Sequence, residues 1–130
     1  YAKQNKLTHT KMINKAGKTV APTSETFQAA AANADWNSKP GYGVILANQP
    51  GDMSWPMTAA TWILIHKKPQ DPAVAAEALK FFAWSYAKGD KMAQELDYVP
   101  MPDNVVGDIM KMWSANIKDA SGKPLYLPTN

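Results

Sequence analysis

Two histidines are the first residues of this chain to test for chemistry, because an imidazole can bind a metal or transfer a proton near neutral pH. His9 and His66 lie far apart in the sequence, and neither belongs to a His-x-x-x-His or Glu-containing metal motif. His66 follows an apolar run, where it could either face a cleft or have a structural role. The chain also lacks the Gly-x-Ser-x-Gly pattern of a nucleophilic serine. We predict no catalytic residue, no metal site and no cofactor.

Acidic pairs and glycine turns give no stronger sign of catalysis. Asp103 and Asp108 could form a pair for acid–base work, but their position on an expected helix favours capping or solvation. The Ser-Gly-Lys sequence at residues 121–123 lacks the earlier glycine and the preceding strand of a phosphate-cradling loop. We therefore predict that the chain is not an enzyme.

The tryptophans suggest a different class of function, since an indole ring can stack on a sugar. Trp62 and Trp113 lie in apolar patterns, which predicts core positions for both. Trp36 and Trp55 lie near expected loops, so their surroundings are less settled. An independent module that binds a small solute or a carbohydrate through exposed Trp36 and Trp55 is therefore the alternative function.

The composition is that of a slightly basic globular domain. The 130 residues are 45% hydrophobic, and 14 basic against 11 acidic residues give a net charge of +3. Every one of those basic residues is Lys, so this chain alone cannot build a site that grips phosphate through the planar fork of an Arg. The lysines are scattered and mixed with acidic residues, which favours a solvated surface over a nucleic-acid partner. The absence of cysteine excludes disulfides within the chain.

Start and stop signals predict a hairpin and several helices that would position these residues. Thr23 or Ser24 can cap a helix that ends near Asn33, and Asp71 with Pro72 can open a longer one. The hairpin is expected from residues 11–13 and 18–20, on either side of a turn. The expected helices cover residues 23–33, 71–89, 90–96 and 102–117.

Residues 61–65 are the best candidate for a β-strand in the sequence. Residues 61–65, Thr-Trp-Ile-Leu-Ile, are short, apolar on both faces and rich in β-branched and aromatic types, as in a strand buried inside an α/β sheet. Residues 44–46 could be a short strand or part of a loop. The Trp55–Pro56 bond could be cis, with trans as the default.

The order of several motifs carries a family resemblance. Trp-Pro-Met-Thr-Ala-Ala-Thr-Trp-Ile-Leu-Ile-His-Lys at residues 55–67 is followed by Leu-Lys-Phe-Phe-Ala-Trp-Ser-Tyr at 79–86 and by Leu-Asp-Tyr-Val-Pro at 96–100. Ser-Gly-Lys-Pro-Leu-Tyr at 121–126 closes the series, and Gly-Lys-Thr-Val at 17–20 precedes it. Over residues 1–126 the chain resembles the C-terminal part of the periplasmic phosphate-binding protein of bacterial ABC phosphate transporters.

The resemblance implies an α/β fold, namely the C-terminal part of a two-lobed periplasmic binding protein of type II. Residues 1–54 would end the second lobe, residues 55–126 would return to and complete the first lobe, and residues 127–130 would form a tail. It also implies a periplasmic substrate-binding component that takes up inorganic phosphate and delivers it to an inner-membrane ABC permease. Members of the family are longer than this chain, so the missing N-terminal portion of the same protein is an implied partner.

The family's phosphate ligands lie in segments that have no counterpart here. No phosphate ligand is therefore assigned to this chain, and neither Asp35 nor Asp52 takes the role of the family's phosphate-binding Asp. The segment after residue 54 resembles the crossing between lobes, which makes Trp55 and Thr58 weak cleft-edge candidates. Such a chain would leave the apolar faces of residues 61–65 and of two long helices uncovered. We expect it to pair with the missing portion, to form an oligomer or to rearrange.

Overall fold

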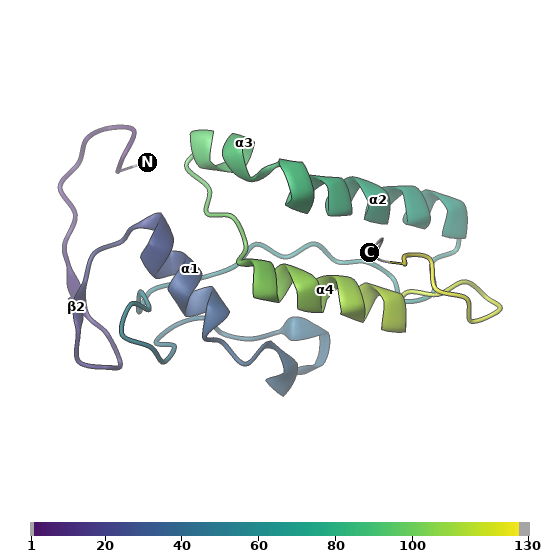
Figure 1. Cartoon of the computed structure of the whole chain (residues 1–130), viewed down its shortest axis with the longest axis horizontal. Coiled ribbons are helices and arrows are strands. Elements are labelled where there is room, and N and C mark those ends of the chain that lie inside the picture. The colour runs from purple at the N-terminus through teal and green to yellow at the C-terminus, as the bar shows by residue number, and fades with distance from the viewer. Residues whose placement is uncertain (1, 128–130) are drawn as a thin grey trace.

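A short hairpin lies in the N-terminal part of the protein (Figure 1). The structure is a computed structural model that describes residues 2–127. Strand β1 (Met12–Ile13) pairs in antiparallel fashion with strand β2 (Thr19–Val20). The Gly17 N–H donates to Asn14 O at 2.9 Å and closes the turn between them. The predicted hairpin is confirmed.

Helix α1 (Ser24–Ala32) follows the hairpin and has the predicted ends. The Thr23 N–H donates to the Thr26 hydroxyl at 3.0 Å, and the Thr26 N–H donates to the Thr23 hydroxyl at 3.4 Å. This reciprocal cap satisfies donors that the first turn leaves without helical partners. The helix ends at Asn33, whose N–H donates to Ala29 O at 3.0 Å.

The stretch between α1 and the C-terminal helices is mostly irregular. It contains two short 3-10 turns, η1 (Trp36–Ser38) and η2 (Pro40–Tyr42). Residues 44–46 form a loop, which was one of the two expected alternatives. The Trp55–Pro56 bond is trans, as are all peptide bonds among the described residues.

Three helices form the C-terminal half of the structure. They are α2 (Pro72–Lys88), α3 (Asp90–Glu95) and α4 (Asp103–Asn116). The Asp71 carboxylate accepts a hydrogen bond from the Val74 N–H at 3.0 Å, which confirms the predicted start of α2. Helices α2 and α4 lie side by side (Figure 1). No helix in residues 2–127 is both long enough and apolar enough to cross a membrane.

Two clusters of buried side chains hold the elements together. The first cluster joins α1, η1 and α4 through Ala31, Trp36, Leu46 and Val105. The second joins α2 to α4 through Leu79, Trp113 and Ile117, and it confirms the core position predicted for Trp113. The first cluster draws on both sides of residue 55, so the two predicted segments share it.

The prediction of a strand at residues 61–65 is wrong, because these residues form no strand in the structure. Among the described residues, sheet pairing is confined to β1 with β2 and to an isolated bridge between Lys118 and Pro124. No backbone group of residues 57–66 makes a hydrogen bond to another described residue, and we call these residues the unpaired segment. It crosses between α2 and α4 in the view of Figure 1. A strand exists only through the N–H and C=O groups of a neighbour, and the described chain provides none here.

The structure therefore combines helices with a very small sheet. That mixture is consistent with a portion of an α/β periplasmic binding protein. The two-lobed arrangement stays a prediction, and residues 128–130 of the predicted tail lie outside the described residues.

Candidate functional site

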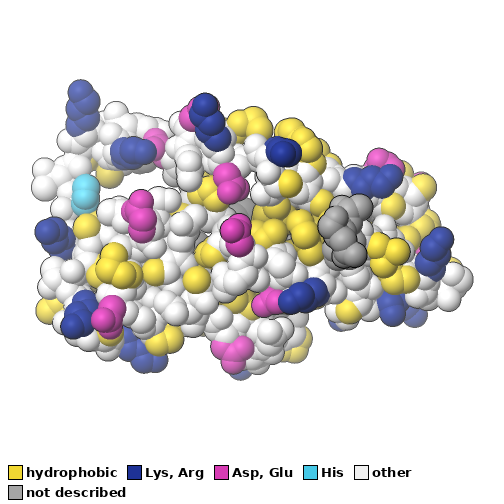
Figure 2. Space-filling model, in the orientation of Figure 1, with side chains coloured by type: hydrophobic (Ala, Val, Ile, Leu, Met, Phe, Trp, Pro, Cys, Tyr) yellow, Lys and Arg dark blue, Asp and Glu magenta, His cyan; other side chains and the backbone are white. Residues whose placement is uncertain are grey.

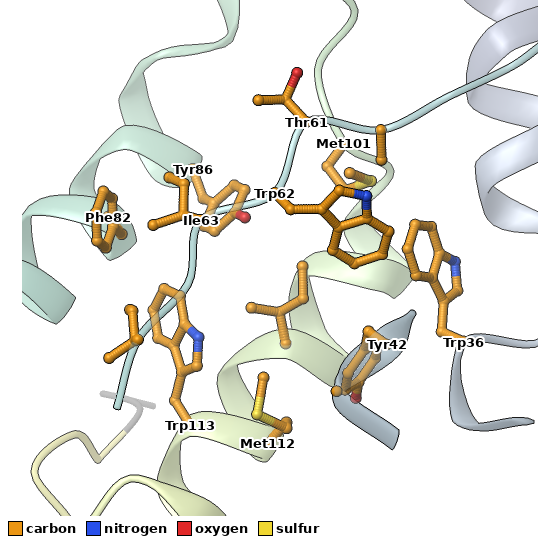
Figure 3. A pocket seen from close by; sticks show the side chains of 14 residues that line it. Trp36, Tyr42, Thr61, Trp62, Ile63, Phe82, Tyr86, Met101, Met112 and Trp113 are labelled. Atoms are coloured by element: carbon orange, nitrogen blue, oxygen red, sulfur yellow. The ribbon is translucent and has the colours of Figure 1, made fainter. Parts of the chain in front are cut away.

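A cavity of about 140 Å³ lies between the unpaired segment, η2, α2 and α4 (Figure 3). Most side chains that line it are aromatic or aliphatic. Trp62 and Ile63 reach it from the unpaired segment, and the rings of Trp36 and Trp62 meet edge to face at 5.8 Å between centroids. Further lining residues are Tyr42, Phe82, Tyr86 and Trp113. The cavity is therefore an apolar space that the unpaired segment, η1, η2, α2 and α4 build together.

Two polar side chains at this cavity, a phenol and an indole, have internal hydrogen-bond partners. The Tyr42 hydroxyl donates to Asp108 O at 3.1 Å, and Trp36 Nε1 donates to Ala31 O at 2.7 Å. Burial raises the pKa of Tyr86, and burial followed by the nearby Asp108 charge raises the pKa of Tyr42. Both phenols are thus neutral at pH 7. With no Lys among the lining residues, the cavity suits an apolar or aromatic surface and cannot compensate the charge of a phosphate.

A second hollow, of about 520 Å³, has lysines on its rim. Lys39, Lys67 and Lys111 lie around it, and Lys111 Nζ pairs with Asp108 Oδ1 at 3.3 Å. All three lysines are exposed, and their ammonium groups are compact point charges on flexible stems. Such a rim attracts anions without fixing their orientation.

Trp55 and Thr58, the cleft-edge candidates, both lie inside the structure. Trp55 is 6% exposed, and its ring packs on Phe27 with 6.1 Å between centroids. The Trp55 N–H donates to Thr26 O at 2.9 Å, and the Thr58 hydroxyl donates to Trp55 O at 2.9 Å. These contacts give both residues a structural role in the described chain. Their place beside a phosphate cleft stays a prediction.

Trp36 and Trp55 do not form the exposed platform that a sugar would need. Trp36 and Trp55 are each 6% exposed, so the observation that motivated the carbohydrate-binding alternative is not found. Trp62 is 44% exposed, which shows that the core position predicted for it is wrong. Its segment pairs with no sheet in the described chain, and its indole meets that of Trp36 edge to face.

The remaining candidates are spread over the surface. His9 and His66 are both exposed, and the residues that the structure describes contain no group of three His, Asp or Glu side chains that could hold a metal. The Asp119 carboxylate accepts hydrogen bonds from the Ser121 hydroxyl at 2.6 Å and from the Lys123 N–H at 2.9 Å. Asp119 thus holds the Ser-Gly-Lys sequence in an ordinary turn, and this turn is not a phosphate-binding loop.

Comparison with known proteins shows which proteins this chain is similar to. The phosphate-binding protein PstS of Pasteurella multocida (strain Pm70) is 48% identical over 126 residues, which are 97% of this chain. This chain is a relative of the PstS phosphate-binding proteins. PstS of Haemophilus influenzae is 46% identical over 91% of the chain, and PstS of Xylella fastidiosa (strain 9a5c) is 42% identical over 91%. The resemblance predicted from the order of the motifs is confirmed.

The match covers only part of each PstS relative. The chain spans 37% of the length of the P. multocida protein, 35% of the H. influenzae protein and 32% of the X. fastidiosa protein. No protein-family model matches the chain. Most of each relative therefore lies outside the region that this structure describes.

Proposed function

We propose that this chain is a C-terminal part of a periplasmic phosphate-binding protein and that the phosphate ligands are supplied by residues outside it. The observation that carries the proposal is 48% identity to PstS over 97% of the chain, with coverage of 37% of that relative. The chain completes two lobes, with residues 1–54 in one and 55–126 in the other. The activity is binding and delivery to an inner-membrane ABC permease, without catalysis.

The chemistry of the described residues supports a divided site. A dehydrated phosphate needs several fixed donors to replace its hydration, and Arg provides two parallel ones. This chain has no Arg, its apolar cavity has no cation, and its lysine-rimmed hollow is exposed. The chain is therefore suited to support the structure around a phosphate site, while the groups that bind the phosphate come from elsewhere.

Equilibrium dialysis with radiolabelled phosphate tests this proposal. The chain is measured alone and after refolding together with the N-terminal part of P. multocida PstS that lies outside the match, with radiolabelled sulfate as the matched control anion. We expect binding of about one phosphate per pair and none to either part alone. Stoichiometric phosphate binding by the isolated chain, or a stable pair that binds no phosphate, would contradict the proposal.

A further inference from the structure

The cavity of about 140 Å³ takes no part in the proposed phosphate binding, because no charged side chain lines it. Its walls are mainly aromatic, with Phe82, Tyr86 and Trp113 on one side in Figure 3 and Trp36, Tyr42 and Trp62 on the other. Apolar cavities of about 150 Å³ in other proteins stay free of water and bind one molecule of the size of benzene. The cavity therefore has the volume and the lining for a single aromatic ring.

Two polar atoms on the inner wall of the cavity have no partner within the described residues. They are the Tyr86 hydroxyl and Trp113 Nε1, for which residues 2–127 provide no hydrogen bond. Each described side-chain nitrogen or oxygen that is fully enclosed has a partner, so these two atoms are open to a small molecule. In the view of Figure 3, both lie on the side of their ring that faces Trp62 and Tyr42. The hydroxyl can donate or accept a hydrogen bond, and the indole N–H can donate one.

The outer wall of the cavity can open without breaking backbone hydrogen bonds. It is formed by the unpaired segment, where Trp62 is 44% exposed and Ile63 is 63% exposed. On the face seen in Figure 2, hydrophobic side chains also gather between α2 and α4. The backbone of residues 57–66 makes no hydrogen bond to another described residue, and segments of this kind open at a low cost in free energy. A small molecule therefore has a route from solvent to the two polar atoms.

We propose that the cavity is a binding site for a small neutral molecule made of one aromatic ring with one hydroxyl group. The ring packs against the aromatic walls in offset or edge-to-face contact. Its hydroxyl accepts a hydrogen bond from Trp113 Nε1 and donates one to the Tyr86 oxygen. This inference goes beyond the proposed function and does not depend on it.

Charge, size and polarity exclude other classes of ligand. A phosphate or a carboxylate would be buried here without a cation, which is strongly unfavourable. A peptide or a chain of sugars is too large for about 140 Å³. A purely aliphatic molecule would leave the Tyr86 hydroxyl and Trp113 Nε1 without a partner.

Titration of the isotope-labelled chain with phenol tests the inference through the indole N–H signals in nuclear magnetic resonance spectra. We expect the Trp62 and Trp113 signals to shift and to saturate with a dissociation constant on the order of 1 mM. The signals of Trp55 and Trp84, which do not line the cavity, are the internal references and should stay unchanged. Benzoate, a charged molecule with the same ring, should cause no saturable shift.

Two pairs of matched variants test the volume of the cavity and its polar group separately. Ala60→Leu fills the cavity and should weaken phenol binding about 10-fold or more, whereas Ala59→Leu, at an exposed neighbouring position, should leave it unchanged. Tyr86→Phe should weaken phenol binding about 5-fold and leave the binding of toluene, which has no hydroxyl, unchanged. Tyr98→Phe removes an exposed hydroxyl outside the cavity and should affect neither ligand. Circular dichroism checks that each variant is folded, and Tyr86→Phe carries the test if Ala60→Leu is not.

The possible results either support or overturn the inference. Saturable shifts confined to the cavity-lining tryptophans, and weakened in Ala60→Leu and Tyr86→Phe alone, would support it. Shifts that do not saturate, or that are equal for all the indoles, would show general partition onto the protein surface and overturn it. Equal binding by Ala60→Leu and Ala59→Leu, or an equal loss of phenol and toluene binding in Tyr86→Phe, would overturn it as well. Phosphate dialysis can succeed or fail without changing any of these results.

Discussion

The region before the unpaired segment and the unpaired segment itself differ in how their backbone groups are satisfied. We call residues 12–56 the hairpin region. There Asn14, 5% exposed, donates from Nδ2 to Asp52 O at 2.8 Å and to Gly51 O at 3.2 Å. Its Oδ1 accepts from the Ala16 and Lys18 N–H groups. One buried side chain thus closes the hairpin and joins it to a distant loop.

The unpaired segment has no comparable device. Its described backbone groups have no internal partner, and one of its aliphatic side chains, Leu64, is almost fully exposed. A loop can be completed by a single well-placed amide, whereas a strand needs another strand. The comparison therefore separates a region that a buried amide joins to a distant loop from a segment whose backbone makes no hydrogen bond to another described residue.

The largest expected effect contrasts one tryptophan from each region. Trp55→Ala removes a buried indole that packs on Phe27, and we expect a loss of about 3–5 kcal/mol in the free energy of unfolding. Trp62→Ala removes an indole that is 44% exposed, so a loss below about 2 kcal/mol is expected. Urea unfolding followed by far-ultraviolet circular dichroism measures both. Equal losses would show that the unpaired segment is packed in solution as firmly as the hairpin region.

The features predictable from the sequence are those whose signals are local. The Thr23 cap of α1 and the Asp71 cap of α2 each act within three residues, so both helix starts could be inferred. The strand at residues 61–65 could not be judged in this way. Its propensity is local, but its hydrogen-bond partners would come from elsewhere, and the described chain lacks them.

The candidate site was less predictable than the fold. Trp36, Trp62 and Trp113 were visible as apolar residues, but only the structure shows that they border one cavity. They come from η1, the unpaired segment and α4, and their spacing in the sequence does not predict that they lie close together. The burial of Trp55 likewise depends on Phe27 of α1, 28 positions earlier in the chain.

A second prediction tests the amide that closes the hairpin region. Asn14→Ala leaves two carbonyls and two N–H groups without their side-chain partner, and we expect a loss of about 2–3 kcal/mol. Asn37→Ala, at an exposed position of η1, is the matched control and should be nearly neutral. Chemical denaturation measures both variants. A neutral Asn14→Ala would mean that water replaces these bonds and that the region is not closed in itself.

Two glycines with positive φ give the next effect. Gly51 has φ +105°, and an added Cβ would lie 2.4 Å from Asn33 Nδ2. Asn33 would then give up its bonds to Ala29 O and Ser54 Oγ. We expect Gly51→Ala to cost about 2 kcal/mol, and Gly122→Ala, which has φ +87° and open space, about 1 kcal/mol. Thermal unfolding measures the loss of stability in each variant. Equal losses in Gly51→Ala and Gly122→Ala would show that backbone strain alone sets the loss, without a contribution from the contact with Asn33.

The smallest expected effect comes from the turn that follows α4. This turn lies next to the unpaired segment, because the Lys118 N–H donates to Lys67 O. Hydrogen bonds, chiefly from the Ser121 hydroxyl and then from the Lys123 N–H, lower the pKa of Asp119 below its ordinary value of 3.8. A carboxyl whose pKa is lower in the folded state stabilises the fold above its ordinary pKa, and this contribution is lost as the pH falls through the lowered pKa.

The difference in melting temperature between the wild-type chain and Asp119→Asn should therefore be positive at pH 7 and shrink toward pH 2. Ser121→Ala removes the main cause of the shift and should show a smaller difference of the same form. Because Asp119 is only half-buried, the effect should also decrease with added salt. If the difference in melting temperature stays constant with pH, Asp119 stabilises the fold through the geometry of the turn and not through its charge. The turn would then resemble the hairpin region, where neutral hydrogen bonds alone close the backbone.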